Sequence, residues 1–193
     1  MGKLCKILLG AFVLSALLLA SCAKDSPTEP LESGSGSEAA SGAISEVKPS
    51  PEPVSFEGID LEGNTVSSEV FSRSKLTMLN VWATYCNPCL NEMPDLGELA
   101  ADYDVSEFQI IGIVSDVLEG EDQSLAESLV GQTGANYTHL LLNESIYYGL
   151  LTDVSAVPTT FFLDQDGVIL DTVVGAMEKS AWEDKINGLL EGL

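Results

Sequence analysis

The sequence predicts an α/β fold in which a central mixed β-sheet is flanked by helices and preceded by a β-hairpin. Two apolar runs, Leu76–Trp82 and Phe108–Val114, have the length and composition of buried strands, and a helix-length segment separates them. Gln165-Asp166-Gly167 is a strong turn signal between two further strand-like runs. This order of strand, helix, strand, helix, hairpin and helix is typical of helices packed on a mixed sheet.

The first half of the predicted domain begins with the hairpin, over Val54–Val66 with Gly63-Asn64 at its turn. After the first buried strand, we expect a helix from Pro88 to about Tyr103. Pro94 cannot donate a backbone hydrogen bond, so a bend is expected near Met93-Pro94. A second helix is predicted over Leu125 to about Gly131, after the second buried strand.

The second half begins with a strand over Thr138–Leu142 and a short helical or irregular piece over Ile146–Thr152. The C-terminal hairpin pairs Thr159–Leu163 with Val168–Val174. A final helix is predicted over Lys179–Leu193, because its apolar residues recur at helical spacing. Those apolar residues are Trp182, Ile186, Leu189, Leu190 and Leu193.

Two cysteines, Cys86 and Cys89, directly follow the first buried strand and have two residues between them. Pro88 lies just inside the helix that follows, where its missing N–H removes no hydrogen bond. Cys86 is therefore expected at the helix N-terminus, where unpaired N–H groups and the helix dipole favour a thiolate over a thiol. Since the thiolate is the nucleophile in sulfur chemistry, the pattern predicts a dithiol that opens and closes.

The N-terminal residues are typical of a signal peptide. Lys3 and Lys6 precede an apolar run, Ile7–Ala20, of about 14 residues, which is short for a membrane span. The run ends in Leu19-Ala20-Ser21-Cys22, which resembles the lipobox of bacterial lipoproteins. That resemblance implies cleavage after residues 1–21 and a lipid on Cys22; the alternative is an uncleaved anchor. Either places the folded part outside the cytoplasm, where disulfides persist.

Residues 22–53 are rich in Pro, Ser, Gly and Glu, and they predict a lipidated cysteine followed by a disordered tether. Residues 54–193 have a normal size for one domain. The whole chain carries a formal charge of −22. This balance argues against nucleic-acid binding, which needs a basic surface, and against charge-driven docking on anionic lipid. Solubility is the simplest reason for it, and a basic partner is the alternative.

The run Asn80–Pro94, joined to Val157–Asp164, resembles the thioredoxin-fold lipoproteins and anchored reductases of the ResA/TlpA type. The resemblance covers most of residues 54–193. It implies a thioredoxin-like fold, thiol–disulfide oxidoreductase activity on protein disulfides, no diffusible cofactor and no bound metal.

The resemblance also assigns roles to residues. Cys86 matches the attacking cysteine and Cys89 the resolving one. Pro158 matches a cis-proline facing the dithiol, and Val157 the neighbouring backbone that pairs with an extended substrate. Glu92 matches a carboxylate that helps to move protons, although spacing alone would also allow an ordinary solvated residue.

Two neighbouring aromatic residues, Trp82 and Tyr85, complete the expected substrate-binding set, although Trp82 could instead belong to the core. Tyr85 stands where this family usually has tryptophan. Leu90 replaces a usual basic residue, which removes a positive charge that would favour the Cys86 thiolate. Asn80 stands where cytoplasmic thioredoxins have a buried aspartate, which leaves Glu92 as the candidate proton carrier.

Three functions fit these residues. The first is a monomeric reductase that serves cytochrome c maturation or a methionine sulfoxide reductase, and takes electrons from a membrane dithiol carrier resembling the CcdA/DsbD type. The second is an oxidase that donates disulfides to exported proteins. The third is a non-catalytic or metal-carrying module, for which zinc would need two further ligands. A static disulfide is a further alternative, and the one histidine, His139, is expected to be structural.

Overall fold

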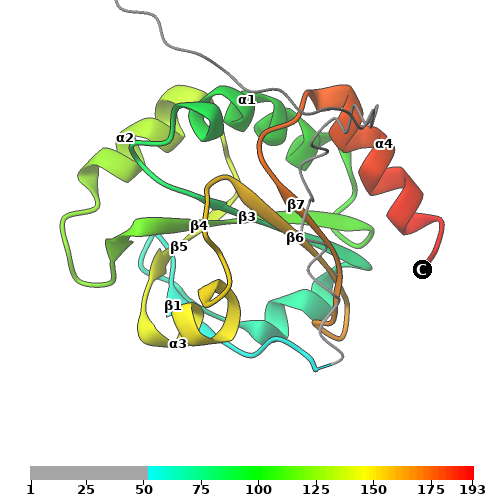
Figure 1. Cartoon of the computed structure of the whole chain (residues 1–193), viewed down its shortest axis with the longest axis horizontal. Coiled ribbons are helices and arrows are strands. Elements are labelled where there is room, and N and C mark those ends of the chain that lie inside the picture. The colour runs from blue at the N-terminus through cyan, green and yellow to red at the C-terminus, as the bar shows by residue number, and fades with distance from the viewer. Residues whose placement is uncertain (1–51) are drawn as a thin grey trace, which may run out of the picture. The chain divides into compact units, whose positions relative to one another are not determined.

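The structure is a computed structural model that describes residues 52–193. A five-stranded sheet in the order β5-β4-β3-β6-β7 forms its centre (Figure 1). β3 pairs in parallel with β4, and β4 with β5, whereas β6 is antiparallel to both β3 and β7. The strands are β3 Leu76–Trp82, β4 Phe108–Leu118, β5 Thr138–Leu142, β6 Thr159–Asp164 and β7 Ile169–Val174. The predicted mixed sheet is confirmed.

The three longest helices cover one face of this sheet, and the hairpin with shorter helical segments covers the other (Figure 1). On the first face lie α1 Asn87–Asp102, α2 Ser124–Thr133 and α4 Lys179–Leu190. On the second lie the antiparallel strands β1 Glu57–Ile59 and β2 Thr65–Ser67, the 3-10 helix η1 Ser68–Arg73, and α3 Glu144–Ile146 with the π-helix η2 Tyr147–Leu151. The predicted N-terminal hairpin is therefore present.

β3 is the central strand, and all of its residues are buried. Met78 packs in the cluster shared with α1 and α4, whereas Leu79 and Val81 pack in the cluster shared with the hairpin, η1 and η2. A strand covered on both faces needs apolar side chains at successive positions, which explains why five of its seven residues are apolar. β3 ends directly before the two cysteines.

The boundaries differ from the prediction where tertiary contacts extend or shorten an element. β4 continues to Leu118 rather than Val114, because it pairs with β5 beyond a register irregularity. α2 runs to Thr133 and ends at Gly134, whose φ of 69° suits a glycine. α4 ends at Leu190 rather than Leu193. The irregular piece is resolved into α3 and η2.

The predicted signal peptide, the lipidated Cys22 and nearly all of the tether lie outside the described residues. Among residues 52–193, no helix combines the length and hydropathy needed to cross a membrane.

Candidate active site

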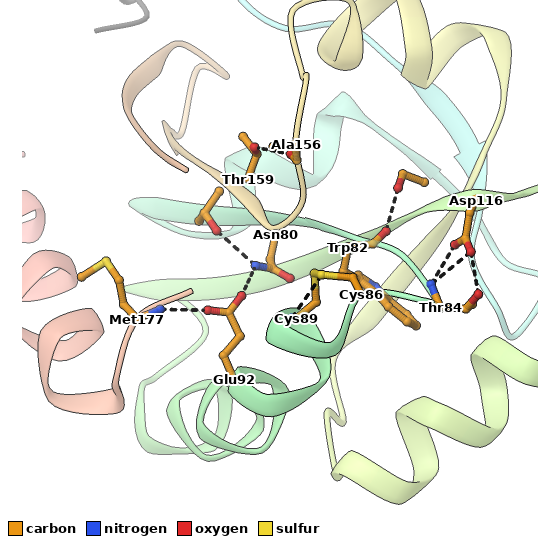
Figure 2. Close-up of a disulfide and its surroundings, with 12 residues drawn as sticks. Asn80, Trp82, Thr84, Cys86, Cys89, Glu92, Asp116, Ala156, Thr159 and Met177 are labelled. Carbon is orange, nitrogen blue, oxygen red and sulfur yellow. Dashed lines mark hydrogen bonds between the residues drawn. A yellow bond between two sulfur atoms is a disulfide. The ribbon is translucent and has the colours of Figure 1, made fainter. Parts of the chain in front are cut away.

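Cys86 and Cys89 form a disulfide with an S–S distance of 2.01 Å at the start of α1 (Figure 2). Cys86 is the N-cap of the helix, and its Sγ accepts a hydrogen bond from the Cys89 backbone N–H at 3.2 Å. Cys86 is 5% exposed, and Cys89 is fully buried. Of the two cysteines, only Cys86 keeps exposed surface, so it is the one open to a partner. Once the disulfide is reduced, this helix N-terminus would stabilise negative charge on the Cys86 sulfur.

The loop that delivers Cys86 is anchored to β4. Asp116 accepts hydrogen bonds from the Thr84 backbone N–H at 2.9 Å and 3.1 Å, and from Thr84 Oγ1 at 2.5 Å (Figure 2). One residue earlier on β4, Ser115 Oγ donates to the Trp82 carbonyl at 2.9 Å. These bonds hold the loop between β3 and α1, so they position the cysteines relative to the sheet.

The Glu92 carboxyl is buried one helical turn after Cys89, with 3% of the residue exposed. It accepts hydrogen bonds from Asn80 Nδ2 at 3.1 Å and from the Met177 backbone N–H at 3.2 Å (Figure 2). Asn80 Nδ2 also donates to Thr160 Oγ1 at 3.1 Å. Burial raises the pKa of Glu92 to about 7, and the bonds from Asn80 and Met177 offset part of that rise. The solvated alternative for Glu92 is therefore wrong.

The Val157–Pro158 peptide bond is cis, as the resemblance implied. Val157 packs against the hydrophobic cluster that contains both cysteines. Thr159 Oγ1 donates to the Ala156 carbonyl at 2.8 Å, and the Gly175 N–H donates to the Pro158 carbonyl at 2.9 Å, so both sides of Val157 are fixed. Within residues 52–193, no backbone hydrogen bond uses the N–H or carbonyl of Val157 itself. Both groups can pair with an incoming extended chain.

The two aromatic residues differ in position. Tyr85 is 74% exposed beside Cys86, which suits contact with a substrate. Trp82 is fully buried, so its placement among substrate-binding residues is corrected: it belongs to the core. Its Nε1–H donates to His139 Nδ1 at 3.2 Å, and burial lowers the pKa of that histidine to about 4. His139 is therefore a neutral, structural residue.

The sequence did not single out Asp116 and Met177 as residues of this site. Asp116 lies beyond the predicted end of its strand, so no pattern placed it next to the cysteine loop. Met177 contributes only its backbone N–H, which carries no residue-type signal. In the described part of the chain, no group of three or more His, Cys, Asp or Glu residues lies close enough to hold a metal ion.

Comparison with known proteins places this geometry in a family. A model of the AhpC/TSA family matches residues 52–172, which include the disulfide, Glu92 and Val157–Pro158. The chain belongs to the AhpC/TSA family. This thioredoxin-like family membership confirms the fold that the resemblance implied.

One curated relative is the thiol-disulfide oxidoreductase ResA of Bacillus thuringiensis, which is 29% identical to this chain over 132 residues. The match covers 68% of this chain and 73% of the relative. The thiol:disulfide interchange protein DsbE of Escherichia coli is 29% identical over 136 residues, or 70% and 69% of the two chains. The solved structure of a thioredoxin family protein from Chlorobium tepidum has the same fold, with a TM-score of 0.62 and 23% sequence identity. The match covers 75% of this chain and 99% of that one. Together with the Cys86–Cys89 disulfide, the two curated relatives make the protein a thiol–disulfide oxidoreductase of the ResA/DsbE type.

Proposed function

We propose that this oxidoreductase acts outside the cytoplasm, anchored by a lipid on Cys22, and reduces disulfides in exported proteins. One observation carries the exchange chemistry: the Cys86–Cys89 disulfide lies at a helix N-terminus, and a buried carboxyl with a pKa of about 7 lies one turn away. Pro88, which precedes the second cysteine as in reducing thioredoxins, supports the reducing direction. The apolar N-terminal run ending at Cys22 and the Pro- and Ser-rich segment after it support the anchor and tether. Such a tether lets the domain reach partners near the membrane face.

The reduced protein would react in two steps. The Cys86 thiolate attacks one sulfur of the partner's disulfide, and a mixed disulfide forms while the partner's other sulfur leaves as a thiolate. Cys89 then loses its proton and attacks Cys86, so the internal disulfide closes and the partner's second thiolate is released. Two electrons pass from the dithiol to the partner. Backbone pairing beside Val157 would hold the partner in line.

Glu92 is the proposed acceptor of the Cys89 proton. It follows Cys89 by three residues on the same helix, and both side chains are buried. A general base works best when its pKa lies near the working pH, and a pKa of about 7 meets this condition. A carboxyl at its ordinary pKa would be a weaker base toward a thiol.

The proposed clients are a cytochrome c maturation protein or a methionine sulfoxide reductase at the cell surface. Each forms a disulfide that must be reduced outside the cytoplasm. Because the two cysteines are the only redox groups of the mechanism and no diffusible cofactor is needed, electrons must come from another dithiol. A membrane dithiol carrier resembling the CcdA/DsbD type would supply them, and the tether would allow repeated docking on it.

Insulin reduction tests the activity directly. The full chain should reduce insulin with dithiothreitol as electron source, and Cys86→Ser should abolish this, because the nucleophile is gone. Reduced Cys89→Ser, freed of dithiothreitol before insulin is added, should trap the mixed disulfide, which mass spectrometry would detect as the mass of insulin added to the protein. A Cys22→Ser variant is the matched control, and it should keep full activity in solution. Undiminished activity in Cys86→Ser would refute the assignment.

The reduction potential decides between reductase and oxidase. Equilibration of the Cys86–Cys89 pair with glutathione buffers should give a potential in the range of reducing thioredoxins, about −270 mV. A value near about −120 mV would support the oxidase alternative instead. Tight binding of copper or zinc to the reduced protein, measured by titration, would favour the metal-carrying alternative.

The pH dependence of the second step tests Glu92. In the parent protein, the rate of Cys89 attack should rise as pH passes through about 7, because ionised Glu92 can accept the proton. In Glu92→Gln this rise should disappear, and the remaining rise should follow the thiol alone, near its ordinary pKa of about 8.5. Stopped-flow decay of the mixed disulfide measures the step. An identical profile in both proteins would remove Glu92 from the mechanism.

A further inference from the structure

A hollow of about 230 Å³ opens beside the dithiol, between Tyr85, η2 and the loop that ends at Val157. Its lining includes the apolar side chains of Val81, Leu142 and Leu151. At its edge, Tyr85 is 74% exposed and Tyr147 is 46% exposed, so two large aromatic rings meet solvent here. The hollow has room for one large apolar side chain, and the mechanism above does not use it.

The hollow is continuous with the proposed binding edge, because Val157 belongs to both. In an extended chain paired beside Val157, successive side chains point in opposite directions. When the partner's cysteine meets Cys86, the side chains next to that cysteine lie within reach of Tyr85 and the hollow. The geometry therefore offers a pocket for a residue that flanks the reacting cysteine.

The end of the sheet that carries the dithiol is uniformly acidic. The segments at this end, residues 83–93, 115–122, 143–158 and 175–178, contain no Lys, Arg or His. Their acidic residues other than buried Glu92 are Asp116, Glu119, Glu121, Asp122, Glu144, Asp153 and Glu178. Asp116 and Asp153 directly adjoin the lining residues Ser115 and Val154.

The basic residues within 52–193 lie outside these segments, although Lys179 directly follows Glu178. They are Arg73 and Lys75, before β3, and Lys179 and Lys185, on α4. Lys75 pairs with Glu107 at 2.9 Å, Lys179 with Glu98 and Asp102 at 3.0 Å each, and Lys185 with Asp171. No cation of the described residues therefore balances the acidic end around the dithiol, and that end attracts positive charge.

We propose that the partner presents a cationic, extended segment with a large apolar side chain next to its reactive cysteine. The acidic residues draw this segment in, Val157 pairs with its backbone, and the hollow takes the apolar side chain. This inference rests on the proposed reductase function and adds the chemistry of the client that it selects.

Four short peptides test it, each linked through its cysteine to 2-nitro-5-thiobenzoate. Lys-Leu-Cys-Leu-Lys has the proposed features, Glu-Leu-Cys-Leu-Glu reverses the charge, and Lys-Ser-Cys-Ser-Lys and Glu-Ser-Cys-Ser-Glu remove the apolar side chains. The full chain is used with Cys5→Ser and Cys22→Ser, pre-reduced with dithiothreitol and desalted. The Cys86 thiolate attacks the disulfide between peptide and nitrothiobenzoate and displaces one of them as a thiolate. Cys89 then attacks Cys86, which closes the internal disulfide and releases the other. The absorbance of the released nitrothiobenzoate measures the rate.

At low ionic strength, the cationic leucine peptide should react about tenfold faster than its anionic counterpart, and this ratio should fall as salt is added. It should also react about tenfold faster than the cationic serine peptide, because only leucine fills the hollow. Ser155→Phe, at an exposed lining position, should remove the leucine preference and keep the charge preference. Asp153→Lys should weaken the preference for the cationic peptide and keep the preference for leucine.

Glu69→Lys is the matched control. It makes the same charge change at an exposed position in η1, whose Val70 carbonyl contacts Gln109 near the start of β4, at the opposite end of the sheet. It should leave both preferences unchanged. Equal rates for all four peptides in the parent protein would overturn this inference and leave the reductase standing. Absence of reaction with every peptide would refute the reductase, and this inference with it.

Discussion

The Glu92 carboxyl couples the active site to the stability of the fold through pH. Its pKa is about 7 in the folded protein, because burial disfavours the charge, against an ordinary value of 4.5. Below pH 4.5 the carboxyl is protonated in both states and costs nothing. As pH rises from 4.5 to 7, the Glu92 carboxyl ionises in the unfolded chain but stays largely protonated in the folded one. The free energy of unfolding therefore falls, by about 3 kcal/mol in total.

Glu92→Gln should therefore flatten the pH dependence of stability. In the oxidised protein, the variant should match the parent at about pH 4 and exceed it above pH 7 by up to about 3 kcal/mol, less the effect of any hydrogen bond that the amide cannot accept. Urea unfolding at the two pH values measures this. If the parent and the variant lost stability in parallel between them, another group would be responsible.

Gly112 shows a different constraint at the scale of one residue. A Cβ added there would lie 2.2 Å from His139 Nδ1, the atom that accepts the hydrogen bond from Trp82. Gly112→Ala should destabilise the protein by about 1–3 kcal/mol or more, since the buried ring must move. Gly131→Ala is the control, because its added Cβ meets nothing within 4 Å in α2. Its free energy of unfolding, measured with urea, should rise by about 0.5–1 kcal/mol.

These residues also mark what the sequence could predict. Cys86 and Cys89 are recognisable from their spacing after a buried strand, and the cis bond at Pro158 from the resemblance to a family. Trp82 was ambiguous, because an aromatic residue before a loop is typical of both a core and a binding surface. The close contact of Gly112 with His139 joins two strands, and no local pattern encodes such a contact.

Among the elements, the connection between β3 and α1 determines where the nucleophile lies. Its anchor is the pair of Thr84 and Asp116, which joins this loop to β4. Thr84→Val keeps the shape of the side chain and removes its donor, so it should cost about 0.5–1.5 kcal/mol. Thr84→Ser keeps the hydroxyl and should cost less. Urea unfolding measures both, and equal losses would mean that the hydroxyl bond contributes nothing.

Element boundaries were predicted well where hydrophobic periodicity determines them and poorly where pairing does. β5 begins and ends as expected, and α1 begins next to the predicted proline. The extension of β4 carries Asp116 to the cysteine loop, and it depends on pairing with β5, which is not visible in either segment alone. The conformation of η2, which lines the hollow, was likewise left open between helical and irregular structure.

For the whole molecule, charge is the property that acts over the longest range. The chain carries a formal charge of −22, and the three lysines among residues 52–193 form ion pairs at the surface. Added salt weakens both the attraction within these ion pairs and the repulsion among the unpaired acidic groups. Exposed ion pairs contribute only about 0–1 kcal/mol each to stability. Repulsion among the excess acidic groups opposes the compact state and should dominate. Salt should therefore stabilise the fold.

The melting temperature should rise by about 2–4 °C as sodium chloride increases from about 0.01 M to 0.15 M, which corresponds to about 1 kcal/mol for a chain of this size. The Debye length falls from about 30 Å to about 8 Å over that range, so most of the rise should occur there and little above it. Circular dichroism melts of the oxidised protein at constant pH measure this. A steady rise up to 1 M would indicate a general salt effect on burial, and a fall would mean that the ion pairs outweigh the repulsion.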